Sequence, residues 1–311
     1  MPGPYAHITL LHELTRPGTP ESIFFPSPGV LAVLDNCFHY CALGAVSPDY
    51  PNLARQDGTA SRWGDAMHIT GVGEMVASGI RRIRGTRGAV RDKQLAWFLG
   101  YCAHVATDVT IHPVVQARVG VYAENQRHHR ICEMNQDSYI YRRMNLGEIG
   151  EADTFARAVA RCSDAGDWAR LDRDIVALWE GMLADAYPQL FAACPPDVAS
   201  WHREFIAKAA DFRAGEMRLF PLAGVIAAKI GAAYPAYGAV DRQYIEEQVV
   251  SSESPCHLHY DEIFDHAAAN VAAMWRVVEQ AVCSDAPAHL PTFENWNLDT
   301  GRDEHDTLVF W

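Results

Sequence analysis

The chain has 311 residues, of which 49% are hydrophobic and 21% are charged, and its formal net charge is −13. This composition is typical of a soluble globular protein, and the length allows one large domain or two ordinary ones. The negative charge and the lack of a long basic cluster argue against binding to a nucleic-acid backbone. They do not exclude a phosphate bound through metal ions, because the metals would supply the positive charge.

The sequence predicts a cytoplasmic protein. We find no segment of 18 or more apolar residues, so we expect no transmembrane helix. The N-terminus lacks the basic region and apolar core of a secretory signal, which leaves signal-independent export as the alternative. The eight cysteines have no zinc-ribbon spacing, and we expect them to be reduced and buried in helices.

Helical periodicity runs through most of the chain, after a first apolar stretch at 4–15. Pattern and stop signals predict helices at 28–45, 65–84, 93–112, 123–144, 153–163, 167–187, 197–213, 217–233, 238–249 and 259–283. Loops are expected at 47–64 and 145–153. Without a strand-rich section or a repeat, the predicted fold class is all-α, a compact multi-helix bundle. It would form one domain over 1–283, with an irregular tail, 284–311, packed on the body.

The most informative pattern is a set of histidines and carboxylates at helical spacing. His104, Asp108 and His112 are four residues apart, so in a helix their side chains lie on one face. The same spacing recurs on a second predicted helix, in His129 and Glu133. These side chains supply nitrogen and oxygen ligands. The pattern therefore predicts a polynuclear metal site in the core of the bundle.

Two local features bear on this site. The apolar run 95–103 precedes His104 and indicates a largely buried helix. Pro113 biases His112 away from helical geometry, so the helix is predicted to end there. The alternative to a metal site is a hydrogen-bonded core pair of His104 and Asp108.

With these pieces in place, the chain resembles the zinc-dependent phospholipase C family, which is related in fold to the S1/P1 nucleases. The resemblance rests on short motifs in a fixed order within about the first 145 residues. The motifs are Ala6-His7-Ile8, LGAVSPDYP from Leu43 to Pro51, WGDAMH from Trp63 to His68, FLGYCAH-x3-D-x3-HP from Phe98 to Pro113, and His129-x3-Glu133. Members of that family hold a cluster of three zinc ions within a helical bundle.

The resemblance implies the ligands of each ion. One ion would be held by Asp49, His68, His104 and Asp108. A second would be held by His112, His129 and Glu133. A third would be held in part by His7, with Asp108 bridging. Secreted members complete the third site with an N-terminal tryptophan that this sequence lacks, so we expect two or three zinc ions.

Residues around the metals have expected roles as well. Asp49 is the expected catalytic residue, as metal ligand or general base. By resemblance Tyr50 would line the substrate pocket, and Trp63 would do the same or anchor a loop. The residues expected to hydrogen-bond to the ligands and orient them are Asp65, Asn125, His128 and Asp137, with direct metal ligation as the alternative for Asp65. His128 is also the alternative to His129 as a ligand.

Clustered divalent metals suit the hydrolysis of phosphate esters, because they polarise phosphoryl oxygens and activate a water. The predicted function is a metal-dependent phosphoesterase, a phospholipase C-like hydrolase of a phospholipid or another phosphodiester, with room for transient membrane contact. One alternative is a helical-bundle enzyme with iron or manganese, either an HD-like hydrolase or an oxygenase. Another is a non-enzymatic, metal-stabilised helical module. The oligomeric state stays undetermined.

Overall fold

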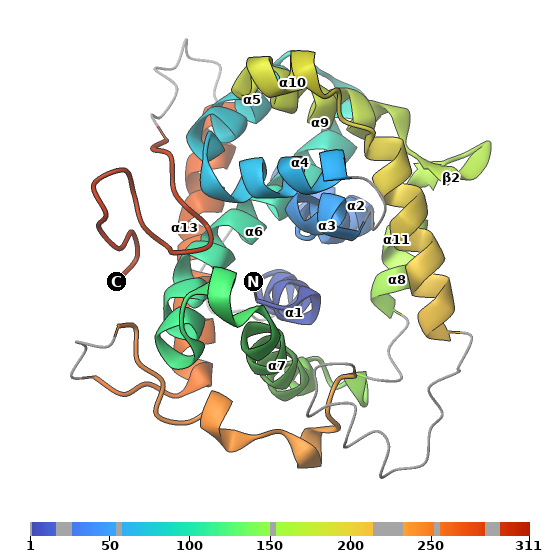
Figure 1. Cartoon of the computed structure of the whole chain (residues 1–311). Coiled ribbons are helices and arrows are strands. Elements are labelled where there is room, and N and C mark those ends of the chain that lie inside the picture. The colour runs from blue at the N-terminus through green and yellow to red at the C-terminus, as the bar shows by residue number, and fades with distance from the viewer. Residues whose placement is uncertain are drawn as a thin grey trace.

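The computed structural model describes residues 2–16, 27–53, 58–149, 154–213, 233–251, 256–283 and 293–311. Within these ranges the chain is almost entirely helical, which confirms the predicted all-α class (Figure 1). Helix α6, Gly88–Val119, is the longest described helix, and the other helices group around it. The bundle is therefore built on the helix that carries His104, Asp108 and His112.

The first half of the chain supplies most of the helices around α6. They are α1 (Pro4–Thr15), α2 (Pro28–Gly44), α3 (Tyr50–Leu53), α4 (Gly58–Ile69), α5 (Val72–Arg84) and α7 (Tyr122–Tyr141). The second half adds α8 (Thr154–Ala160), α9 (Arg173–Ala186), α10 (Pro188–Ala193), α11 (Val198–Arg213) and α13 (Tyr260–Cys283). Short 3-10 turns are η1 (Ser47–Asp49), η2 (Arg142–Met144), η4 (Tyr237–Ala239) and η5 (Arg242–Tyr244). The strands β1 (Ser163–Asp164) and β2 (Asp167–Leu171) pair as a small antiparallel hairpin.

The predicted end of a helix at His112 is wrong, because α6 continues to Val119. Pro113 lacks an amide hydrogen and so removes one helical hydrogen bond. The turn around it, residues 111–115, is buried, and tertiary packing holds it helical against the local preference.

Three other segments differ from the prediction. Residues 167–171 form β2 instead of the start of a helix, because the turn Ala165-Gly166 folds the chain back on β1. The predicted loop at 47–64 contains η1, α3 and the first part of α4. The predicted helix at 238–249 is replaced by the turns η4 and η5, and Gln248 then pairs with Leu258 as an isolated bridge.

The predicted helix at 217–233 lies outside the described residues, apart from residue 233. The expectation that the cysteines are buried is wrong for Cys256 and Cys283, which are exposed.

One apolar stretch of the described chain, Pro28–Asn52, is long and apolar enough to span a membrane. The stretch is not an unbroken apolar run, since it contains Asp35, Asn36 and His39, so a search for uninterrupted apolar segments does not find it. Much of the stretch is α2, which packs along α6 and buries part of its surface inside the protein. A core helix of a bundle has the same composition as a membrane-spanning one, so the packing accounts for its apolar side chains.

Two glycines let α2 and α6 meet backbone to backbone. A Cβ on Gly44 would overlap the carbonyl of Trp97, and a Cβ on Gly100 would overlap the carbonyl of Cys41. Only glycine allows such an approach without displacing a helix. The contact brings the end of α2 close to the part of α6 that carries the histidines.

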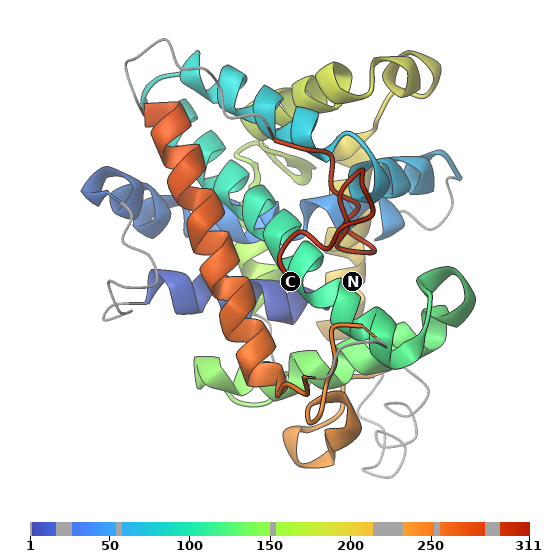
Figure 2. The same cartoon turned by 90° about the vertical axis from the view of Figure 1, so that its left-hand side faces the viewer.

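Residues 293–311 form an irregular segment against the bundle. The backbone N of Leu298 donates to the carbonyl of His68 at 2.7 Å, and Nε1 of Trp311 donates to the carbonyl of Thr110 at 2.8 Å. Figure 2 shows this C-terminal segment, in dark red, beside the middle of α6. The segment is thus bonded both to the end of α4 and to α6.

We predict that Gly100→Ala destabilises the protein by about 1–3 kcal/mol, because the added methyl group must push α2 away from α6. Gly29→Ala is the matched control, since Gly29 is exposed in the first turn of α2 and a Cβ there meets only the Ser27 hydroxyl at 3.7 Å. That substitution should leave stability unchanged or raise it by up to ~1 kcal/mol. Denaturant titration gives the free energy of unfolding of each variant, and equal values for the two would contradict the prediction.

Candidate metal centre

Asp108 lies at the centre of a cluster of histidines, and its side chain is fully buried. Its Oδ1 lies 3.2 Å from Nε2 of His7. Its Oδ2 lies 3.1 Å from Nε2 of His104, 3.7 Å from that of His68 and 3.9 Å from that of His112. Four histidines therefore direct a ring nitrogen at one carboxylate.

Several elements carry these residues, so the cluster forms only when the bundle folds. His104 and Asp108 are one turn apart on α6, while His7 comes from α1 and His68 from the last turn of α4. Asp49 ends η1, and its Oδ1 lies 3.4 Å from Nε2 of His68. The rings of His7 and His104 stack with their centroids 4.5 Å apart. With His112, the structure thus brings together six residues that the sequence had proposed as ligands.

Backbone carbonyls orient two of the rings. Nδ1 of His104 lies 2.9 Å from the carbonyl of Ala45, and Nδ1 of His68 lies 2.8 Å from the carbonyl of Gly64. Because a carbonyl only accepts, each Nδ1 carries a hydrogen, and in the neutral ring Nε2 then holds a lone pair. Both Nε2 atoms point into the cluster, which is the arrangement of a metal-binding histidine.

The atoms that face one another inside the cluster have no hydrogen-bond partner among the described residues. They are both ring nitrogens of His7, Nε2 of His68, His104 and His112, both carboxylate oxygens of Asp108, and Oδ1 of Asp49. So many unsatisfied buried polar atoms are costly in a native protein. A bound cation would satisfy them, and imidazole nitrogen with carboxylate oxygen is a ligand set that suits zinc, as well as iron or manganese.

Two groups of three residues have ligand atoms that all lie within 4.8 Å of one another. One group is His7, His104 and Asp108, and the other is Asp49, His68 and His104. Since His104 belongs to both groups, they form one continuous cluster. The cluster joins ligands that the family resemblance had divided between two ions.

The charges within the cluster favour a cation. Burial alone would raise the pKa of Asp108, but His104 and His112 beside it lower that pKa well below its ordinary value. For His68, burial alone would lower the pKa, but the carboxylates of Asp49 and Asp108 raise it to about 9. Asp108 is therefore ionised, and its negative charge attracts a metal ion. His68 holds a proton near neutral pH in the metal-free protein, and a bound metal ion would displace that proton from Nε2.

The ligand group predicted for the second ion, His112, His129 and Glu133, does not converge as the residues around Asp108 do. His129 and Glu133 are neighbours on α7, with 3.9 Å between Nδ1 and Oε1. Nε2 of His129 lies 2.6 Å from the carbonyl of Gly120, whereas Nε2 of His112 faces Asp108. Within the described ranges, His112, His129 and Glu133 do not form a group with ligand atoms inside 4.8 Å.

Three of the residues that were expected to hydrogen-bond to the ligands form no hydrogen bond with them in the described structure. His128 is exposed, because consecutive residues of a helix are rotated by about 100° and its neighbour His129 takes the inner position. Asp65 is exposed on α4. Asn125 lies at a kink of α7, where its amide donates to the carbonyl of Val121 at 3.1 Å. No hydrogen bond joins these three side chains to the cluster in the described part of the protein.

Asp137 supports the cluster through α1. Its buried carboxylate accepts hydrogen bonds from the backbone N of Ala6 at 2.7 Å and of Tyr5 at 3.3 Å, and from the Tyr234 hydroxyl at 3.2 Å. The two backbone donors are among those that a helix leaves unsatisfied at its start. His7 follows Ala6 directly, so Asp137 holds the end of α1 that carries this histidine.

Tyr50 and Trp63 lie in the core of the described structure. The ring of Tyr50 stacks on Phe205 of α11 with centroids 5.1 Å apart, and its hydroxyl faces Nδ1 of His202 at 3.4 Å. Nε1 of Trp63 donates to the carbonyl of Cys194 at 3.0 Å. Both side chains are buried. The hydrogen bond of Trp63 agrees with the alternative that it anchors a loop, and contact of Tyr50 with substrate stays a prediction.

Two residues near the ligands were missed by sequence reasoning. Tyr122, at the start of α7, is 38% exposed and lies edge-on to His129 with ring centroids 5.2 Å apart. Asp299, in the C-terminal segment, has Oδ1 3.9 Å from Nδ1 of His112. No local pattern marks either residue, since Tyr122 opens a helix and Asp299 lies in an irregular segment remote from His112 in the sequence.

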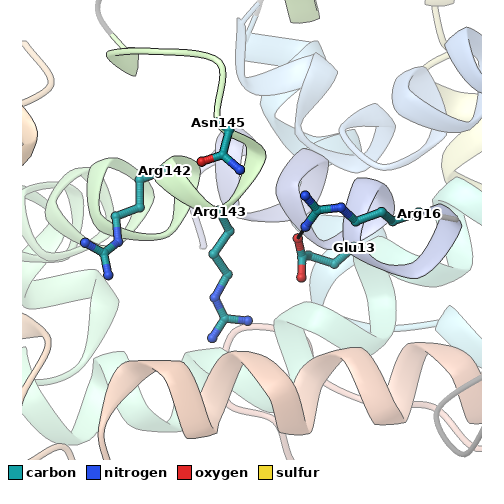
Figure 3. Close-up of a pocket in the computed structure, with 5 residues that line it drawn as sticks. All are labelled: Glu13, Arg16, Arg142, Arg143 and Asn145. Carbon is teal, nitrogen blue, oxygen red and sulfur yellow. Dashed lines mark ion pairs between the residues drawn. The ribbon is translucent and has the colours of Figure 1, made fainter. Parts of the chain in front are cut away.

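A surface pocket of about 430 Å³ is lined by none of the cluster residues (Figure 3). Its lining residues are Glu13, Arg16, Arg142, Arg143 and Asn145. Arg16 lies 3.5 Å from Glu13, and Arg142 donates to the Tyr237 hydroxyl. Arg143 pairs with Asp261 at 2.7 Å and Asp265 at 2.6 Å. The arginines are engaged within the protein, so we assign this pocket no ligand.

Comparison with known proteins gives a family match. A family model described as zinc dependent phospholipase C matches residues 6–188, which is more than half of the chain and includes every proposed ligand. Comparison with curated proteins and with solved structures gave no match. The matched range ends before α11, α13 and the C-terminal segment.

We predict that Asp137 makes the stability of the metal-depleted protein depend on pH. Burial raises the pKa of its carboxyl from 3.8 to about 8, so the folded protein holds a proton that the unfolded chain has released. The resulting stabilisation is complete below the unfolded pKa and is lost as pH rises toward the folded pKa. Asp137→Asn has no such proton. The free energy of unfolding of the wild type minus that of this variant should therefore fall between about pH 5 and pH 8, by at most ~1.4 kcal/mol per pH unit.

Denaturant titrations across this pH range, with a chelator present, check the prediction. Asp35→Asn is the control, because Asp35 is exposed on α2, and its difference from the wild type should stay constant with pH. A constant difference for Asp137→Asn as well would show that Asp137 does not titrate in this range.

Proposed function

This chain belongs to the zinc-dependent phospholipase C family, and from that membership we propose that it is a zinc-dependent phosphoesterase that hydrolyses a phospholipid or a related phosphodiester. The observation that carries the proposal is the buried cluster around Asp108, in which His7 and His104 direct ring nitrogens at one carboxylate. The cluster offers the nitrogen and oxygen ligands that a zinc hydrolase needs. Its unsatisfied atoms are the strongest support from within the molecule.

The chemistry that zinc supplies when bound is Lewis acidity, which polarises a phosphoryl oxygen and brings the pKa of a water to about 7. Asp108 would hold cations at the buried base of the cluster, with His104 oriented toward it by the carbonyl of Ala45. The Asp49 side chain is 18% exposed, so a substrate could approach the cluster from this side.

Asp49 is suited to the role of general base. Burial alone would raise the pKa of its carboxyl, but His68 and His104 beside it lower that pKa below its ordinary value. Asp49 is therefore ionised and can accept a proton from the attacking water. The same carboxylate would act as a ligand through Oδ1, which faces His68.

Exposed apolar side chains beside the ligands support a lipid substrate. Ile69 follows His68, and Val121 and Tyr122 lie at the start of α7 next to His129. Val121 and Tyr122 are adjacent in the sequence and both are exposed, and tyrosine suits a boundary between lipid and water. The proposal therefore includes transient contact with a lipid surface during hydrolysis.

The ligand types of the cluster suit zinc, iron and manganese alike. We favour zinc because the chain belongs to a zinc-dependent family. HD-type hydrolases carry adjacent His and Asp residues at their metal. The His-Asp dipeptide of this sequence, His305-Asp306, is exposed in the C-terminal segment, so it cannot serve the buried cluster.

We predict that the purified protein contains about two or three zinc ions per chain and releases a phosphorylated head group from phosphatidylcholine vesicles. Asp108→Asn removes the negative charge at the centre of the cluster. Zinc content should fall, and hydrolysis should drop on the order of 10²-fold or more. Asp35→Asn, on the exposed face of α2, should have the zinc content and the hydrolysis rate of the wild type. Plasma mass spectrometry measures the metal, and a water-soluble phosphate assay measures the product.

A soluble phosphodiester, bis(p-nitrophenyl) phosphate, tested in parallel with the vesicles separates a lipid substrate from a soluble one. A zinc-loaded protein that hydrolyses neither substrate would contradict the proposal. Iron or manganese in place of zinc would favour the other helical-bundle enzymes.

A further inference from the structure

Asp299 lies beside a proposed ligand although its segment is outside the range that matches the family. Its side chain is 32% exposed, and its Oδ1 is 3.9 Å from Nδ1 of His112. At this distance Oδ1 and Nδ1 are too far apart for a hydrogen bond, so the carboxylate acts on the ring through its charge. On the other side of the ring, Nε2 of His112 faces Oδ2 of Asp108, also at 3.9 Å, and has no hydrogen-bond partner in the part of the chain that the structure describes. The imidazole of His112 therefore lies between a buried carboxylate and a surface carboxylate.

The turn that carries Asp299 is bonded to the backbone of another ligand. The N of Leu298 donates to the carbonyl of His68 at 2.7 Å. The side chain of Asn297 accepts from the backbone N of Asp299 at 3.0 Å, a local bond that tightens turns. The position of Asp299 is thus tied to the end of α4.

The same turn is pressed against α6 next to His112. Gly301 has φ of +66°, and a Cβ at this position would overlap the ring of Pro113, the residue after His112. Further along, Nε1 of Trp311 donates to the carbonyl of Thr110 at 2.8 Å. The segment is therefore anchored to α4 and α6 on both sides of Asp299, and its carboxylate lies beside Nδ1 of His112.

We propose that Asp299 is a positioning residue of the metal centre. A carboxylate beside Nδ1 favours the ring form with hydrogen on Nδ1, so the lone pair of His112 lies on Nε2 and points toward Asp108 and a divalent cation. Carboxylates in this position fix the orientation of metal-binding histidines and make them more basic. The inference rests on the proposed zinc site, and it adds a residue from the C-terminal segment to ligands that all lie within 6–188.

The zinc affinity of the full chain tests this role. Metal-depleted protein is titrated with zinc in competition with a chromophoric chelator, and its unfolding temperature is measured without metal. Asp299→Asn keeps the size of the side chain and removes its charge. Zinc affinity should fall about 10–100-fold, while the unfolding temperature of the metal-free protein stays that of the wild type.

Asp306→Asn is the matched control. Asp306 lies in the same segment, is 88% exposed and has a positive φ that asparagine also adopts readily. Zinc affinity of this variant should equal that of the wild type. Wild-type affinity in Asp299→Asn would overturn the proposal, as would an equal loss in the control.

A double-mutant cycle separates positioning from other roles. If Asp299 acts through His112, then Asp299→Asn in a His112→Ala background leaves the affinity for the remaining zinc unchanged, and a further loss there would overturn the proposal. A wild-type protein that binds no zinc would overturn both this inference and the proposed function. Zinc-dependent hydrolysis by the wild type, together with unaltered zinc affinity in Asp299→Asn, would overturn the inference alone.

Discussion

The buried negative charge of Asp108 is the constraint on which the rest of the structure depends. An ionised carboxylate without solvent contact is tolerated only where polar or positive groups compensate it. Here the compensation comes from histidines of α1, α4 and α6, each with a ring nitrogen directed at the carboxylate. These helices cannot separate without leaving a charge uncompensated in an apolar interior. The cluster therefore stabilises the packing of the helices in the N-terminal half of the chain, and a bound cation would stabilise it further.

The contacts that pack the core also orient the metal ligands. The glycine contact between α2 and α6 brings the carbonyl of Ala45 to His104, and a carbonyl within α4 orients His68. Asp137 on α7 holds the start of α1, which carries His7. A displacement of any of these helices changes the direction of a ring nitrogen. Stability and metal binding are consequently linked, because the contacts that stabilise the bundle also aim the ligands.

The sequence by itself determined the fold class and the inner face of α6. His104, Asp108 and His112 were identified from their spacing, because residues four apart on a helix face the same way whatever surrounds them. The same reasoning preferred His129 over His128, and the structure indeed buries the former and exposes the latter. Asp49, His68 and His7 could be proposed only from the order of motifs, since no local spacing joins them. Their meeting around Asp108 required the fold.

Tertiary structure alone decided the outcomes that depend on distant segments. α6 passes through Pro113 because the surrounding turn is buried, although the local preference is to end the helix. Tyr50 packs against α11, and Asp299 is brought to the outer face of His112 by a segment without regular structure. Helical periodicity encodes which residues share a face of one element. It does not encode which elements meet, because that choice follows from the packing of side chains far apart in the sequence.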